Sequence, residues 1–260
     1  MSENEAKIIA QLRQSRKYRD LCDETLGRMA QWALAQNSSL KVATKAAKRK
    51  LHQVYGAYVG QVNADQILAL VDQVDDQDPK PICEQILRTH VSTAERVDDL
   101  ETVFDAIWSV TGQPKRVMDL ACGLNPFTLP WMGAIDAYMA CDIDMGLANC
   151  IGKFFENMKF NGISVCSDLL VSVPNWNADV VFLFKALPCL EQQEKGASLA
   201  ILKALRVPHI VVSFPSQSIG GYNKGMVAHY DGVVEQLAND LHLQMQAIPL
   251  PRESYYVLSA

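Results

Sequence analysis

The sequence has no uninterrupted apolar run of about 18 residues, the length that a membrane-spanning helix requires. Its first seven residues, Met-Ser-Glu-Asn-Glu-Ala-Lys, contain no apolar core of the kind found in secretion signals. The seven cysteines form no Cys-x-x-Cys pair and are odd in number, which disfavours a zinc site and a disulfide framework. We therefore expect a cytoplasmic protein with free cysteine thiols and no bound metal.

Acidic residues outnumber basic residues overall, but the charges are unevenly distributed along the chain. The 260 residues carry a formal net charge of −5. Residues 1–60 contain 11 Lys and Arg against 5 Asp and Glu, whereas residues 61–260 contain 13 against 24. A basic amino-terminal part on an acidic protein predicts contact with a polyanion. The alternative is a solvated helical face without a partner.

The amino-terminal quarter of the chain has the apolar spacing of helices. Apolar residues recur at helical intervals over 3–36, with a break near 18–23, and a basic helix is expected over 41–55. Lys41, Lys45 and Lys48 share one face of that helix, where like charges repel each other unless an anion lies beside them. A short acidic helix should follow over 64–76. These patterns predict a helical domain over residues 1–75.

Residues 76–260 alternate between helical and strand-like segments, which predicts an α/β domain. A helix is expected over 82–111, and two more over 146–159 and 191–205. Strands are expected at 116–121, 137–142, 163–167, 179–184, 209–214, 243–249 and 254–259. Only a short segment separates the last two, so they should form an antiparallel hairpin. A mostly parallel, Rossmann-like sheet of seven strands closed in this way is typical of class I S-adenosylmethionine (SAM) methyltransferases.

The most informative segment is the first expected strand and the turn that follows it, Arg116-Val-Met-Asp-Leu-Ala-Cys-Gly123. Glycine lets the backbone approach a ligand where a Cβ atom would collide with it. Open α/β sheets bind ligands at the carboxyl ends of their strands, where this turn would lie. Asp119 could hold an amine of the cofactor or the backbone of the turn. The alternative is an ordinary strand and turn.

Two further acids follow the next strands. Asp142 ends the second strand, 19 residues after Gly123, where an acid in a nucleotide-type fold accepts the ribose hydroxyls. The turn lacks the G-x-G-x-x-G glycines that a pyrophosphate needs, which favours SAM over a dinucleotide. Asp168 follows the third strand and could accept the adenine amine, although a helix N-cap is the alternative.

The fourth and fifth strands end in residues that could meet the methyl acceptor. Lys185 should emerge over the cofactor, unless it is a surface lysine that extends into solvent. The Asn-Pro-Pro-Tyr type of motif that grips an exocyclic amine is absent here. The loop after Phe214 is long and contains glycine, as substrate loops often do. Phe214 or Tyr222 could stack on a base and Lys224 could contact a phosphate. An inert surface loop is the alternative.

Several strings in order along the chain resemble the aminoglycoside-resistance 16S rRNA methyltransferases of the Arm/Rmt type. The strings are Ser15-Arg16-Lys17-Tyr18-Arg19, Leu51-His52 with Gly56-Ala57-Tyr58-Val59, His90-x-Ser92-Thr93-x-Glu95-Arg96, Asp119-Leu-Ala-Cys-Gly-Leu-Asn-Pro126, Cys141-Asp142-Ile143, Phe184-Lys185-x-Leu187-Pro188, Ser213-Phe214-Pro215 and Gly220-Gly221-x-x-Lys224-Gly225-Met226. The similarity runs from about residue 15 to residue 226. Members of that family methylate N7 of guanine 1405 in the decoding site of the 30S subunit.

The resemblance implies roles that spacing alone does not. For the cofactor S-adenosyl-L-methionine, Arg96 would meet the carboxylate, Gly123 and Asp142 would line the methionine and ribose parts, and Asp168 and Leu169 would flank the adenine. The residues implied to lie near the target nucleotide are Lys185, Glu191, Lys224 and Met226. The residues implied to dock the helical domain on 16S rRNA are Arg16, Lys17, Lys48, Arg49 and Lys50.

The resemblance also implies the chemistry. Guanine N7 has a free lone pair, so we expect a direct methyl transfer that needs no general base, with Glu191 stabilising the charge that develops on the purine. Family members commonly carry arginines where this chain has Gln217 and Tyr222, so two expected cations are missing. We expect a monomer. The alternatives are methylation of another rRNA site and a non-catalytic 30S-binding homologue.

Overall fold

The computed structural model describes residues 1–55, 63–216 and 225–260 of the chain. Its centre is a seven-stranded sheet in the order β3-β2-β1-β4-β5-β7-β6. The strands are β1 (Arg116–Leu120), β2 (Ala137–Asp142), β3 (Gly162–Cys166), β4 (Val180–Phe184), β5 (His209–Pro215), β6 (Gln244–Pro249) and β7 (Glu253–Ser259). The first five run parallel, and β7 pairs antiparallel with both β5 and β6. The expected hairpin-closed sheet is confirmed.

Helices cover both faces of the sheet, so its central strands are buried on both sides. Successive residues of β1 alternate between two cores, with Val117 facing one and Met118 the other. The first face packs on α4 (Ala64–Val71), α5 (Lys80–Leu87), α7 (Leu100–Thr111) and α8 (Met145–Asn157), and the second on α9 (Leu187–Gln193), α10 (Ala197–Ala204) and α11 (Met226–Leu241). This two-sided burial explains why the strands read as continuous apolar runs.

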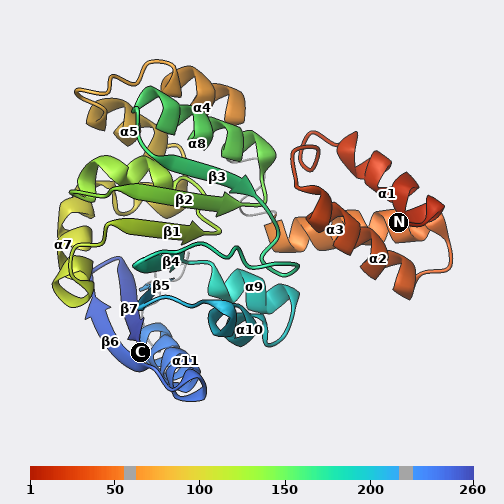
Figure 1. Cartoon of the computed structure of the whole chain (residues 1–260). Coiled ribbons are helices and arrows are strands. Elements are labelled where there is room, and N and C mark those ends of the chain that lie inside the picture. The colour runs from red at the N-terminus through yellow and green to blue at the C-terminus, as the bar shows by residue number, and fades with distance from the viewer. Residues whose placement is uncertain (56–62, 217–224) are drawn as a thin grey trace.

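A separate helical unit precedes the sheet and has a core of its own. It comprises α1 (Glu3–Arg13), α2 (Asp23–Gln36) and α3 (Leu40–Tyr55). Its core consists of small and branched side chains from all three helices, including Ile8, Leu12, Leu26, Ala33 and Ala47. In Figure 1 this unit lies on the side of the molecule toward which the arrowheads of β1, β2 and β3 point.

The division between the two parts comes earlier than residue 75. Helix α4 does not join the amino-terminal unit, because Ile67 and Val71 are buried in the core that packs against the sheet. Asn157 of α8 donates a hydrogen bond of 2.8 Å to the Val71 carbonyl oxygen. The α1–α3 unit therefore ends before α4, and the expected domain boundary is corrected accordingly.

The helix expected over 82–111 is broken into four pieces. After α5 come α6 (Val91–Ala94), the 3-10 turn η1 (Val97–Asp99) and α7. His90 has extended backbone, and its Nδ1 accepts a hydrogen bond from the Ser92 N–H, which caps α6. The break turns Arg96 inward, toward the carboxyl edge of the sheet. The helix expected over 191–205 is likewise two helices, separated at Gly196, whose φ of +85° ends the continuity. No helix within the described ranges is long and apolar enough to cross a membrane.

Candidate active site

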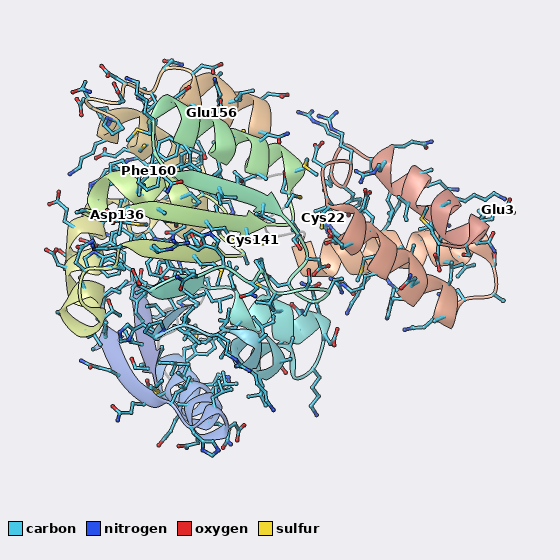
Figure 2. The ribbon with its side chains drawn as sticks, in the orientation of Figure 1. Glu3, Cys22, Asp136, Cys141, Glu156 and Phe160 are labelled. Atoms are coloured by element: carbon cyan, nitrogen blue, oxygen red, sulfur yellow. The ribbon has the colours of Figure 1, made fainter. Side chains whose placement is uncertain are left out.

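A pocket opens at the carboxyl edge of the sheet, between the sheet and the α1–α3 unit. The turns after β1 and β2, the ends of β3 and β4, and the segment around α6 line it. Leu21, which precedes α2, also lines it. Figure 2 shows Cys22, the next residue, on the side of the helical unit that faces the end of β2, where Cys141 lies. Ligands of open α/β sheets bind at this edge.

The turn after β1 and the end of β2 are joined by one carboxylate. The Gly123 N–H donates to Asp142 Oδ2 at 2.9 Å, and Asp142 Oδ1 accepts from the backbone N–H groups of Ile143 and Asp144 at 2.8 and 3.2 Å. Burial raises the pKa of Asp142, and these backbone donors oppose the rise. Gly123 has a φ of +51°, a conformation that glycine adopts without strain. Both residues line the pocket, as expected.

Asp119 lies beneath this turn and does not line the pocket. Its side chain is completely buried, and its Oδ2 accepts hydrogen bonds from Asn125 Nδ2 at 2.9 Å and from the Tyr138 hydroxyl at 2.6 Å. Burial raises the pKa of Asp119 to about 7. Direct contact between Asp119 and a cofactor was expected and is wrong, because the carboxyl is enclosed by protein. Asp119 instead holds Asn125 in place.

Arg96 is the buried cation of the pocket. Its Nη2 donates to Asn125 Oδ1 at 2.8 Å, and its Nη1 donates to Glu253 Oε2 at 3.2 Å and to the Ser92 carbonyl at 3.3 Å. Its Nε is buried and has no hydrogen-bond partner within the protein. Arg96 lines the pocket and therefore presents a charged group where an anionic group of a ligand could bind.

Lys185 follows β4 in a left-handed conformation, with a φ of +55°. Its backbone N–H donates to both the carbonyl and the hydroxyl oxygen of Ser213, each at 3.1 Å. Its Nζ lies 2.7 Å from Glu95 Oε2 and 3.3 Å from Glu253 Oε2. The side chain is only 11% exposed, so it does not extend into solvent. Lys185 and Arg96 form one cationic wall of the pocket.

Sequence analysis missed Glu253, which serves both cations of that wall. The residue lies at the start of β7 and pairs with Pro215, at the end of β5, because β7 runs antiparallel to β5. The first residue of β7 is thereby placed at the carboxyl edge of the parallel strands. Ser213 donates a short hydrogen bond to the second oxygen of Glu253. No local motif around Glu253 indicated this position.

The end of β3 supplies the opposite wall through Asp168 and Leu169. Both are buried and both line the pocket. Asp168 Oδ1 accepts from the Leu170 N–H at 2.9 Å, and Oδ2 accepts from three side-chain donors of α2. No helix begins here, so the helix N-cap alternative is wrong. One acceptor position of Oδ1 is left over after these bonds.

Three residues expected near the methyl acceptor or the RNA lie elsewhere. Glu191 is exposed and accepts hydrogen bonds from the N–H groups of Gly196 and Ser198, at 2.6 and 3.1 Å, so it caps α10 outside the pocket. Phe214 is 1% exposed and stacks on Tyr230 with the ring centroids 4.3 Å apart, so it cannot stack on a base. Met226 begins α11 and is not among the residues lining the pocket. Gln217, Tyr222 and Lys224 lie outside the described residues.

The basic residues of the amino-terminal unit form one surface. The Tyr18 hydroxyl donates to the Lys48 carbonyl oxygen at 3.4 Å, which places the turn that carries Arg16 and Lys17 beside α3. Arg16, Lys17, Lys48 and Arg49 are exposed. Lys50 is partly covered, and its Nζ lies 5.8 Å from the centre of the Trp32 ring. Four exposed cations on adjoining segments suit a polyanion better than a small ligand.

Known proteins share both this sequence and this fold. The profile of the ribosomal RNA methyltransferase family FmrO matches residues 14–257. A 16S rRNA (guanine(1405)-N(7))-methyltransferase of Serratia marcescens is 36% identical, over 83% of this chain and 82% of that protein. One from Micromonospora rosea is 34% identical, over 94% of this chain and 92% of that protein.

Solved structures agree with the sequence matches. The structure of the 16S rRNA methyltransferase RmtF in complex with S-adenosyl-L-homocysteine has a TM-score of 0.87 and 30% identity, covering 100% of this chain and 99% of that one. The 16S rRNA methylase RmtB has a TM-score of 0.83 and 29% identity, covering 100% and 99%. The chain therefore belongs to the FmrO family of ribosomal RNA methyltransferases, with the fold of the enzymes that methylate 16S rRNA.

Proposed function

We propose that this protein transfers a methyl group from SAM to N7 of guanine 1405 in 16S rRNA of the assembled 30S subunit, and so confers aminoglycoside resistance. The observation that carries the proposal is the pocket that unites Arg96, Gly123 and Asp142, in a chain whose relatives bear the name of this activity. The α1–α3 unit adds an exposed basic surface suited to RNA. Both halves of the reaction therefore have a place on the molecule.

The pocket residues fit SAM in an order that follows the sheet. The buried Arg96, with an unpartnered Nε, suits the carboxylate of the methionine part. Asp142 stands at the end of the second strand, where an acid would accept the ribose hydroxyls. Leu169 offers an apolar surface to the adenine ring, and the free acceptor position on Asp168 Oδ1 suits the adenine amine. We propose no metal.

When bound, SAM supplies an electrophilic methyl group on a sulfonium sulfur. Guanine N7 offers its lone pair directly, so the protein need not remove a proton. Catalysis then consists of holding a guanine, turned out of its stack, in line with the methyl group. Lys185, held in the pocket wall by Glu95 and Glu253, is the described residue best placed to orient the guanine. Its φ of +55° is the kind of strained conformation found at functional sites.

RNA docking would use the basic surface of the α1–α3 unit. Arg16, Lys17, Lys48 and Arg49 would contact phosphates, which position the enzyme without reading the base sequence. Lys50 would contribute less, because its side chain is partly covered and lies near Trp32. The proposed assignments of Tyr222 and Lys224 to the RNA concern residues outside the described ranges.

The test is to incubate purified 30S subunits with the protein and methyl-labelled SAM and to map the label by aniline cleavage, which cuts RNA at N7-methylguanine. Label at guanine 1405 is expected. An Asp142→Ala variant should show none and is the control for contaminating activity. Label at another rRNA position, or 30S binding with no label, would overturn the assignment. Cells expressing the chain should resist kanamycin and gentamicin but remain sensitive to apramycin.

A further inference from the structure

The α1–α3 unit forms part of the proposed cofactor pocket, in addition to carrying the basic surface. Leu21 lines the pocket and pairs in an isolated β-bridge with Asp144. The Cys22 N–H donates to the Ile143 carbonyl at 2.8 Å, and the Met145 N–H donates to the Asp20 carbonyl at 2.7 Å. These bonds attach the unit to the turn that directly follows Asp142. A movement of the unit would therefore disturb the ribose side of the pocket.

A second attachment is made by the side chain of Arg28, on α2. Its Nε and Nη2 both donate to Asp168 Oδ2, at 3.0 and 2.7 Å, and Nη2 also donates to Gln193 Oε1 at 2.9 Å. Thr25, one turn earlier on α2, donates to the same Asp168 oxygen at 2.9 Å. Asp168 and Gln193 both line the pocket. Arg28 thus connects α2, the end of β3 and α9.

The chemistry of Asp168 makes Arg28 more than an adhesive contact. The Asp168 side chain is 2% exposed, and a carboxylate so deeply buried requires a cation and hydrogen bonds to remain charged. Arg28 supplies the cation, and its side chain is itself only 19% exposed. All the donors of α2 converge on Oδ2, which leaves Oδ1 directed by the Leu170 N–H alone. The orientation of the acceptor offered to the adenine amine therefore depends on α2.

We propose that Arg28 is a positioning residue that holds Asp168 for the adenine end of SAM and thereby couples cofactor occupancy to the placement of the RNA-docking helices. The inference rests on the proposed function for the identity of the cofactor. Coupling between two sites is reciprocal in free energy. The cofactor should therefore steady the α1–α3 unit, and a docked unit should hold the cofactor more tightly.

The first measurement is the affinity of purified full-length protein for S-adenosyl-L-homocysteine (SAH), by titration calorimetry without RNA. Arg28→Met keeps the aliphatic stem but removes the charge and the donors, and should weaken SAH binding by about tenfold or more, as expected for the loss of charged hydrogen bonds. Arg28→Lys should fall between the two, because it keeps the charge and loses the fork. The matched control is Arg13→Met, since Arg13 pairs with Asp23 inside the same unit, and it should bind SAH like the wild type.

The second measurement separates coupling from simple structural support. SAH should slow amide hydrogen exchange in α2 and α3 of the wild type, and this protection should be lost in Arg28→Met while the variant retains a cooperative unfolding transition. If Arg28→Met does not fold, Thr25→Val removes one donor to the same oxygen with little change of shape, and should show the same two effects at smaller size. In a double-mutant cycle, Arg28→Met should add little to the SAH loss of Asp168→Asn.

The outcomes are distinguishable. A wild-type protein that binds SAH, together with a folded Arg28→Met variant of equal affinity and equal SAH protection, would refute the coupling alone. Wild-type protein that binds no SAH would refute the proposed cofactor and the coupling with it. Loss of SAH affinity and protection in Arg28→Met would support the coupling, even if 30S subunits proved not to be the substrate, because neither measurement uses the ribosome.

Discussion

Arg96 and Glu253, separated by 157 positions in the sequence, form an ion pair in which Nη1 lies 3.2 Å from Oε2, and neither side chain is more than 5% exposed. The same Glu253 oxygen lies 3.3 Å from Lys185 Nζ. One carboxylate therefore partners both cations of the pocket wall. The two cations are held at the edge of the sheet before any ligand arrives, which reduces the ordering that binding must bring about.

Glu253→Gln should destabilise the fold strongly. The substitution keeps the shape of the side chain but removes the charge, and leaving one member of a buried ion pair without its partner costs about 3–5 kcal/mol. The free energy of unfolding should fall by about that amount in urea titrations. Glu101→Gln is the matched control, because it breaks a pair with Lys80 whose side chains are 72% and 42% exposed. Its effect should be below about 1 kcal/mol, and equal losses in the two variants would contradict the prediction.

Asp119 should make the stability of the protein depend on pH. Burial raises the pKa of Asp119 from 3.8 to about 7, so between these values the folded protein retains a proton that the unfolded chain releases. The wild type should therefore lose stability relative to Asp119→Asn as pH rises from about 4 to about 7, by at most about 1.4 kcal/mol per pH unit, and the difference should level off above that range. Unfolding titrations of both proteins at several pH values test this, and a pH-independent difference would show that Asp119 is ionised throughout.

Gly123→Ala should weaken SAH binding as well as stability. A left-handed conformation costs a residue with a Cβ atom about 1–2 kcal/mol. Gly123 and Gly196 have φ values of +51° and +85°, and an added Cβ would meet no heavy atom within 4 Å at either position. Gly196→Ala should therefore carry a comparable backbone cost far from the pocket. Only Gly123→Ala should reduce SAH affinity, by about tenfold or more, which corresponds to about 1.4 kcal/mol. Equal SAH affinities in the two variants would place the cofactor elsewhere.

Removing Lys48 and Arg49 together should weaken 30S binding and reduce its salt dependence. Each lost phosphate contact should lower the slope of the logarithm of affinity against the logarithm of salt concentration by about 1. SAH affinity should be unchanged, because neither residue lines the pocket. Lys153→Ala is the control, since this exposed lysine lies on α8 and pairs with Glu156. An unchanged salt slope in the double variant would mean that another surface meets the RNA.

Most of the fold could be predicted because its signals are local. The alternation of strand and helix along residues 116–260 led to all seven strands, with boundaries within a residue or two of those observed. The predicted helix over 82–111 was wrong, because the extended conformation at His90 and the capping of α6 break it. The helix over 64–76 was assigned to the wrong part of the chain, since periodicity does not reveal which core receives Ile67 and Val71.

The candidate site was predictable only in part. Arg96, Gly123, Asp142, Asp168, Leu169 and Lys185 line one pocket, as their positions after strands or within a recognisable string led us to expect. Asp119, Glu191 and Phe214 lie outside it, because side-chain burial and capping depend on neighbours that are remote in the sequence. Asn125 lies in a quoted string, yet its role as the bridge between Asp119 and Arg96 was not visible there.

The sequence by itself determined the class of fold, the glycine turn with its acid 19 residues later, and the concentration of positive charge near the amino terminus. Each of these is encoded in neighbouring residues, through backbone preference, apolar period or composition. Only the tertiary structure decided that Glu253 serves Arg96 and Lys185 and that Arg28 holds Asp168. Those contacts depend on the order of the strands, the antiparallel direction of β7 and the docking of α2 against the sheet, and no local pattern specifies these.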